Sequence, residues 1–184
     1  MSRFPSSRRA WLILTLSVSL ALASLLLALM VGSVSVPVRV TLDALVGQSA
    51  DASAVLVRDL RLPRAVAGFA CGGLLALAGA LLQILLRNPL ADPYVLGVSG
   101  GAGVGALSAM LFGASGALVG GSAFAGALAV MLIVFGLASG DGAWTQTRLL
   151  LTGVVVSAGC GAGVALILSV SPEKQLHGML FWLM

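Results

Sequence analysis

The side chains of this sequence that could do chemistry begin with Arg61 and Arg64, three residues apart in the segment RLPR. Residues spaced i and i+3 share one face of a helix, so the segment predicts two cationic groups at a helix end. One interpretation is that both side chains anchor that end at a membrane surface, as interfacial arginines commonly do. The other is that they receive carboxylates from a partner. The spacing alone favours the first interpretation.

The apolar run that follows, residues 65–86, carries one amide and several glycines. Gln83 must find a hydrogen-bond partner or line a wet path, and we favour an interhelical hydrogen bond. Gly68 and Gly72 are four residues apart, and such pairs of small residues let helix backbones approach closely in lipid. We therefore expect this run to lie among other helices.

The segment RNPLADP interrupts the apolar run. A residue before a proline is pushed out of the α region, so Asn88 and Asp92 end the helix, and Asn88 is interpreted as a turn residue. Asp92 is a suitable N-cap and Pro93 a suitable first residue for the next helix. The predicted turn comprises Arg87, Asn88, Pro89, Asp92 and Pro93.

The sequence shows no catalytic or metal-binding set. His177 is the single histidine, and Cys71 and Cys160 lie inside separate apolar runs. A disulfide framework or a metal site needs more ligands at closer spacing. We therefore predict no catalytic residue and no bound metal.

Nucleotide-binding motifs are also missing from the sequence. The chain has one lysine, Lys174, and no P-loop pattern. Residues 101–106 fit GxGxxA, but no strand precedes them and no acidic residue follows at the required distance. Close helix packing at Gly97 and Gly101 explains these glycines better, so we expect no cofactor to be bound by this chain.

The composition places the chain in lipid. Of its 184 residues, 59% are hydrophobic and only 9% are charged, whereas soluble domains carry about 25% charged residues. The net charge of +4 comes from residues scattered over short loops. Without a basic patch there is no footprint for nucleic acid, which we exclude as a partner.

The elements that position these residues are five apolar runs, each about as long as the hydrocarbon core is thick. The predicted fold class is an all-α membrane protein, a polytopic helical bundle. The first run is longer than the apolar region of a signal peptide. The predicted spans are residues 11–32, 65–86, 94–112, 116–137 and 149–170, followed by a short helix over residues 171–184.

Capping chemistry predicts three further helix starts. Thr41 is a possible N-cap for a short interfacial helix in TLDALVGQ. Pro63 suits the first turn of the second span. Ser171 and Pro172 are expected as the N-cap and the first residue of the last helix.

Five spans place the two chain ends on opposite sides of the membrane. With the N-terminus inside, each side holds five Lys or Arg residues, so the positive-inside rule is tied. Arg3, Arg8 and Arg9 precede the first span and favour a cytoplasmic N-terminus. Arg61 and Arg64 then lie where the rule disfavours them, which indicates that they have a function.

The combination of RLPR, Gln83 and RNPLADPYVLGVSGGAG resembles the membrane-spanning permease subunits of type II ABC importers, the FecCD/BtuC-like family. The segments RLLLTG, ending at Gly153, and QLHGMLFWLM, ending at Met184, are similar as well. The resemblance covers nearly the whole chain beyond the first helix.

The resemblance implies a transport function and a set of partners. Such permeases work in pairs in the bacterial inner membrane and import iron–siderophores, haem or vitamin B12. Two ATPase subunits dock on the cytoplasmic face, and the turn that contains RNPLADP is expected on the same side of the membrane. A periplasmic binding protein delivers the ligand, and its acidic residues meet periplasmic arginines, a role that passes here to Arg61 and Arg64. The short last helix is expected at the periplasmic mouth.

The family has about ten helices per subunit, so the resemblance implies that this chain is the N-terminal half. A truncated gene product, a split gene and a partial sequence all fit. The alternative function is a non-transporting membrane scaffold or a permease remnant. An ion-coupled transporter ranks last, since the predicted spans hold no Asp, Glu or His as a coupling site.

Overall fold

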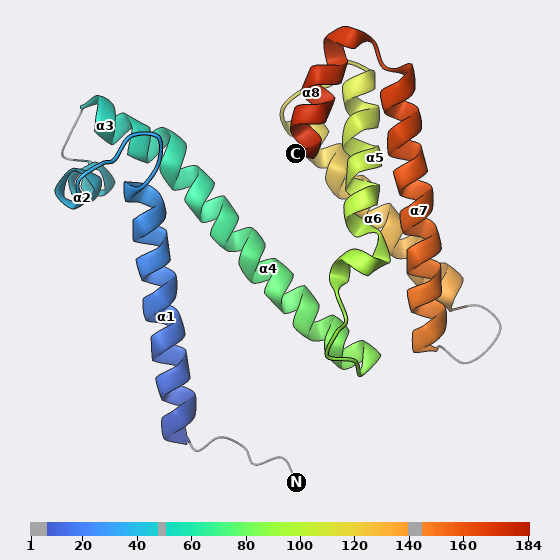
Figure 1. Ribbon diagram of the computed structural model, residues 1–184, viewed down its shortest axis with the longest axis horizontal. Helices are drawn as coiled ribbons and strands as arrows, with labels where there is room; N and C mark the ends of the chain where they lie inside the picture. Colours follow the sequence, from blue (N-terminus) through green and yellow to red (C-terminus); the bar gives the residue numbers. More distant parts are fainter. Residues whose placement is uncertain (1–6, 48–50, 140–144) are drawn as a thin grey trace. The chain divides into compact units, whose positions relative to one another are not determined.

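The computed structural model describes residues 7–47, 51–139 and 145–184, and every regular element in these ranges is helical (Figure 1). The chain divides into two compact units, residues 1–76 and 77–184, and the boundary falls inside the long helix α4. The elements in order are α1 (Ser7–Met30), α2 (Val38–Val46), α3 (Ala52–Val55), the π-helical turn η1 (Leu56–Arg61), α4 (Leu62–Leu86), the 3-10 turn η2 (Pro93–Leu96), α5 (Val98–Leu111), α6 (Ala117–Ala138), α7 (Gln146–Val170) and α8 (Glu173–Leu183).

Four of the described helical stretches are long and apolar enough to cross a membrane. They are Ser7–Met30, Ala52–Leu85, Ala117–Ala138 and Gln146–Val170. The helix α5 is apolar but shorter, at 14 residues. The all-α fold class predicted from the sequence is confirmed.

The third predicted span, approximately residues 94–112, contains two helical elements, η2 and α5. Gly97 has a φ of +75°, in the left-handed region, and it separates the 3-10 turn η2 from α5. A backbone at positive φ cannot continue a right-handed helix, and glycine adopts it at low cost. The regular helix therefore begins at Val98.

The second span was expected to begin with Pro63 in its first turn, but helical backbone runs without a break from Ala52. Inside a helix a proline ring clashes with the carbonyl of the residue four positions earlier. The π-helical turn η1 ends at Arg61, two residues before Pro63, and the Leu62 N–H donates to the carbonyl of Val57, five residues back. This wider turn accommodates the proline inside a continuous helix.

Two of the predicted caps are also wrong. Thr41 lies inside α2, buried, and its Oγ1 donates to the Pro37 carbonyl at 3.1 Å. Ser171 lies at the end of α7, where its Oγ donates to the Ile167 carbonyl, and α8 follows Pro172. Both hydroxyls bond back to a carbonyl four residues earlier, the usual alternative to capping for Ser and Thr.

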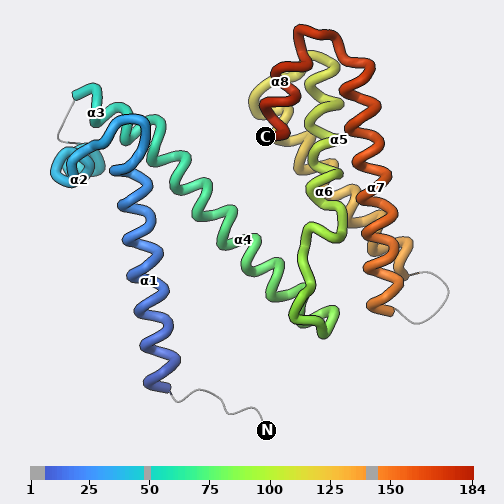
Figure 2. Tube along the Cα trace, in the orientation of Figure 1, coloured from blue at the N-terminus to red at the C-terminus, as the bar shows by residue number. Residues whose placement is uncertain are grey.

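The first unit is built around the C-terminal end of α1. Figure 2 shows α2 beside that end, and α3 contacts α2 and η1. These helices and η1 share a small apolar core, to which each of them contributes one buried side chain. The buried members are Leu29, Val36, Ala44, Ala54 and Val57.

In the second unit, α5 is packed against α6, α7 and α8 (Figure 1). Gly101 makes this possible: a Cβ built there would lie 2.6 Å from the Gly126 carbonyl oxygen of α6. A Cβ built at Gly97 would likewise lie 2.9 Å from the Cα of Ser157 in α7. Leu107 of α5 and Met179 of α8 are fully buried in the same core. The chain therefore uses Gly101 of α5 and Gly97 just before it for close backbone approach.

Gly68 and Gly72 of α4 differ from the glycines of α5. A Cβ built at either position meets no atom of the described residues within 4 Å. The expectation that these two glycines admit a neighbouring helix stays a prediction.

Candidate functional site

The Arg61 side chain reaches the end of α1. Its Nη1 donates to the carbonyls of Leu29 at 2.9 Å and Met30 at 3.1 Å, and its Nη2 donates to the carbonyl of Val34. The last carbonyls of a helix lack intrahelical partners and carry the negative end of its dipole. The half-buried guanidinium of Arg61 therefore caps α1.

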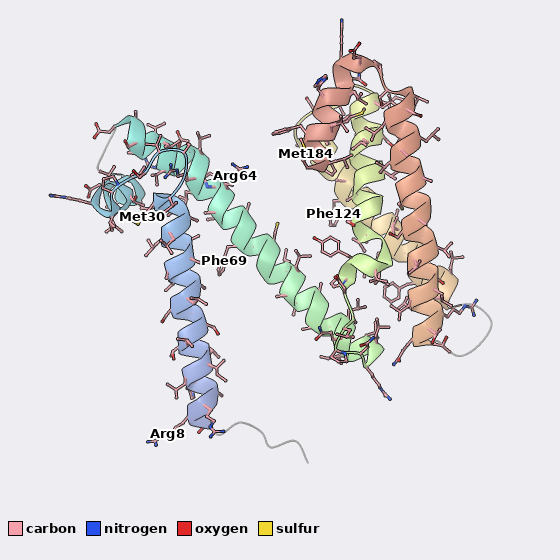
Figure 3. All side chains as sticks on the ribbon, viewed as in Figure 1. Arg8, Met30, Arg64, Phe69, Phe124 and Met184 are labelled. Atoms are coloured by element: carbon pink, nitrogen blue, oxygen red, sulfur yellow. The ribbon has the colours of Figure 1, made fainter. Side chains whose placement is uncertain are left out.

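Arg64 has a different environment. Figure 3 labels it near the start of α4, and its side chain is exposed. Within the described residues it makes no side-chain hydrogen bond or ion pair. The structure thus separates the two arginines of RLPR, since one is bound within its own unit and the other faces outward. A docking role for either residue stays a prediction.

The turn after α4 closes the helix with a Schellman motif. The Arg87 N–H donates to the Ile84 carbonyl at 3.2 Å, and the Asn88 N–H donates to the Gln83 carbonyl at 3.1 Å. These are the two bonds that define the motif. The residue at its left-handed position is Arg87, with a φ of +45°, the only non-glycine residue with positive φ among those described. Glycine is usual there, so Arg87 holds a costly backbone conformation.

Side chains complete this turn. The Asn88 Oδ1 accepts from the Leu90 N–H at 2.9 Å, and the Asp92 Oδ1 accepts from the Tyr94 N–H at 2.9 Å. Asp92 is therefore an N-cap with Pro93 at the first helical position, as predicted, although the element it caps is the 3-10 turn η2. Asn88 has the turn role predicted for it.

Gln83 belongs to the same turn. Its Nε2 donates to the carbonyl of Pro89 at 3.0 Å. The partner is thus in the loop that follows the same helix, whereas we had favoured a bond to another helix. The alternative role of Gln83, lining a wet path, stays a prediction.

The sequence analysis missed Gly32, which lies against the Arg61 guanidinium. We call Arg61, its three carbonyl partners and Gly32 the arginine site. A Cβ built at Gly32 would lie 2.8 Å from Nη2 of Arg61, so the missing side chain leaves room for the guanidinium. The only sequence signal is a glycine shortly after an apolar helix, which is typical of helix ends in general.

Potential metal ligands are dispersed in the part of the chain that the structure describes. No group of three or more His, Cys, Asp or Glu side chains in it could hold an ion. Cys71 and Cys160 are both free thiols. The arrangement offers cationic and hydrogen-bonding groups at helix ends.

The long apolar helices place the chain in the class of helical proteins that cross a membrane several times. Comparison with known proteins identifies the family. A model of the FecCD transport family matches residues 20–184, so the chain belongs to that family. The chain is 47% identical over 147 residues to the ferric enterobactin transport system permease protein FepD of Escherichia coli, with 77% of this chain and 44% of that protein covered.

Other relatives and a solved structure agree. The cobalamin import system permease protein BtuC of Halobacterium salinarum is 42% identical over 132 residues, which cover 71% of this chain and 35% of that protein. A solved inward-facing conformation of an ABC transporter assigned to the metal-chelate type aligns with a TM-score of 0.71 and 28% identity, covering 91% of this chain and 49% of that one. The chain therefore spans less than half the length of these curated relatives.

Proposed function

We propose that the chain forms part of the permease subunit of a bacterial ABC importer. The imported ligand is an iron–siderophore, haem or a cobalamin-type compound. The subunit lies in the inner membrane and pairs with a second permease subunit, identical or different. Two separate ATPase subunits drive it, and a periplasmic binding protein delivers the ligand. The observation that carries this proposal is the family match over residues 20–184 together with the 47% identity to FepD.

Uptake by the complex tests the proposal. The protein is tagged and purified from its own cell membranes in mild detergent, then reconstituted in liposomes with the binding protein and ATP. We expect ATPase subunits to co-purify and one of three ligands to be taken up: a ferric siderophore, haem or cobalamin. Retention of ATPase subunits without uptake of any of the three would contradict transport and favour a membrane scaffold.

Docking of the binding protein is proposed to use Arg64, which is exposed and carries an unneutralised charge in the described structure. Arg64→Glu should weaken docking about fivefold, because a favourable exposed pair becomes a repulsive one. The measurement is the affinity of the binding protein for the complex in nanodiscs at low salt.

Arg8→Glu is the matched control, since Arg8 is exposed at the start of α1, at the opposite end of that helix from the arginine site (Figure 3). It changes the net charge by the same amount and should leave docking unaltered. The difference between the two variants should shrink at high salt, because mobile ions screen exposed charges. Equal affinity of Arg64→Glu and the unmodified complex at low salt would rule out this role.

A further inference from the structure

The side of α2 that faces away from its core is apolar. Thr41 and Ala44 are buried in the first unit, and Val40 beside them is half-buried. At about 100° per residue, the positions opposite this buried face are Leu42 and Val46. Four apolar side chains on or beside the outward face are 38% to 70% exposed: Val38, Leu42, Leu45 and Val46. A helix on a wetted surface carries polar residues there, so contact with water does not account for this face.

The direction of α2 is that of a helix lying along a membrane surface. Figure 1 shows it running crosswise to α1, at the end of that helix. The helix α1 has 24 residues and is apolar enough to cross a membrane. With nine residues, α2 is about 14 Å long and too short to cross a hydrocarbon core of about 30 Å. A short helix crosswise to the end of a spanning helix lies in the plane of the membrane.

Positive charges flank the outward face of α2. Arg39, in the first turn, is exposed and lies about 20° around the helix from Val46. Arg58 of η1 lies at the other end, since a Cβ built at Gly47, the C-cap of α2, would be 3.0 Å from its Nη2. Neither guanidinium forms an ion pair within the described residues. Asp43, the one acidic residue of α2, is half-buried and lies farther from the apolar face. The charges therefore favour an anionic partner.

The exposed apolar surface continues along the chain from α1 into α2. It includes two side chains near the end of α1 and two of the loop that follows: Leu26, Leu27, Val31 and Val34. Exposed apolar side chains of a spanning helix contact acyl chains. The outward face of α2 thus begins where the lipid-facing surface of α1 ends. Lipid is already present there, whereas a second protein would have to displace it.

We propose that α2 is a membrane-surface helix that binds anionic phospholipids. Its apolar face, formed by Val38, Leu42, Leu45 and Val46, lies at the boundary between headgroups and acyl chains, where such helices are buried by about 5–10 Å. Arg39 and Arg58 bind headgroup phosphates, because a guanidinium can donate two parallel hydrogen bonds to one phosphate. This lipid site goes beyond the proposed transport function and holds for either orientation of the chain.

The depth of a spin label tests the position of α2. The chain carries Leu42→Cys, with Cys71 and Cys160 replaced by alanine. It is purified with the subunits that accompany it and placed in nanodiscs of phosphatidylethanolamine and phosphatidylglycerol. Oxygen concentrates among acyl chains, so we expect it to relax the label several times more strongly than a water-soluble nickel chelate does. Val46→Cys, one turn along, repeats the measurement if Leu42→Cys fails to fold.

Two further labels calibrate this depth. Leu16→Cys, 73% exposed in the middle of α1, gives the value for acyl chains, and Asp51→Cys, exposed before α3, gives the value for a polar position. Access of nickel at Leu42 equal to that at Asp51 would overturn the membrane-surface position. Shielding of the Leu42 label from both oxygen and nickel would also overturn it, because a protein would then cover the face.

Quenching by labelled lipids tests the phosphate contacts. A fluorophore on Val46→Cys should be quenched about fivefold more by doxyl-labelled phosphatidylglycerol than by the same fraction of doxyl-labelled phosphatidylcholine, the preference expected for one positive charge at an anionic surface. Arg39→Gln with Arg58→Gln should abolish this preference and leave the depth of the Leu42 label unchanged. Arg8→Gln, at the other end of α1, is the matched control and should keep the preference. Equal quenching by the two lipids in the protein with both arginines would overturn the anionic-lipid site.

Discussion

At the scale of single residues, the unusual feature is the left-handed backbone of Arg87. The Schellman motif needs positive φ at this position, and glycine adopts it without a Cβ clash. Arginine there costs roughly 1 kcal/mol. The exposed side chain stands at the C-terminal end of α4, where a positive charge interacts favourably with the helix dipole and offsets part of that cost.

We predict that Arg87→Val destabilises the protein by about 1–2 kcal/mol relative to Arg87→Gly, because a β-branched side chain tolerates positive φ worst. The measurement is the midpoint of thermal unfolding in detergent. The same pair of substitutions at Arg64 is the control. On that exposed helical surface valine should be equal to or better than glycine, since glycine is the poorer helix former. The same order at both positions would contradict a left-handed backbone at Arg87.

At the scale of elements, the contact between α5 and α6 depends on two glycines whose backbones nearly touch. The pair is Gly101 of α5 and Gly126 of α6. A side chain at either position meets the backbone of the opposite helix, which cannot move aside as a flexible side chain can. The same rule explains Gly97, which combines a positive φ with a close approach to Ser157.

We predict that Gly101→Ala destabilises the protein by about 1–3 kcal/mol, because the new Cβ would lie 2.5 Å from Cγ2 of Val130 and 2.6 Å from the Gly126 carbonyl oxygen. Thermal unfolding of the purified protein measures the loss. Gly121→Ala on α6 is the matched control, since a Cβ there meets nothing within 4 Å among the described residues. It should be neutral or slightly stabilising, because alanine favours helix. Equal effects of the two substitutions would refute the packing described here.

At the scale of the whole molecule, the positions of the positive charges bear on the orientation of the chain in the membrane. The positive charges are tied between the two sides, and only the arginines before the first span favour a cytoplasmic N-terminus. On this basis we propose a cytoplasmic N-terminus.

We predict that a cysteine at Ser49 is labelled by an impermeant maleimide from outside the inner membrane, in a background with Cys71 and Cys160 replaced by alanine. Ser49 lies outside the described residues and falls in the sequence between α2 and α3. A cysteine at Leu90, which is 87% exposed in the turn after α4, is the paired control. It should react only after the membrane is permeabilised. The reverse labelling pattern would overturn the proposed orientation.

Features that depend on neighbours in the sequence were predictable. Hydrogen bonds between residues two positions apart close the cap at Asp92 and the turn at Asn88, so the local sequence determines both. The apolar runs likewise predicted the long helices, because lipid leaves the backbone few alternatives. The start of the second span was missed, because the π-helical turn before Pro63 keeps the helix continuous where a proline ordinarily marks a beginning.

The sequence by itself determined the helical class, the family resemblance and the chemistry of the turn. Only the tertiary structure decided which identical residues have different surroundings. Arg61 and Arg64 look equivalent in RLPR, yet the acceptors of Arg61 are 27 to 32 residues away in the chain. Gly72 and Gly101 are both glycines of apolar helices, yet only Gly101 touches another backbone among the described residues. Such contacts depend on how helices meet in space, which no local pattern encodes.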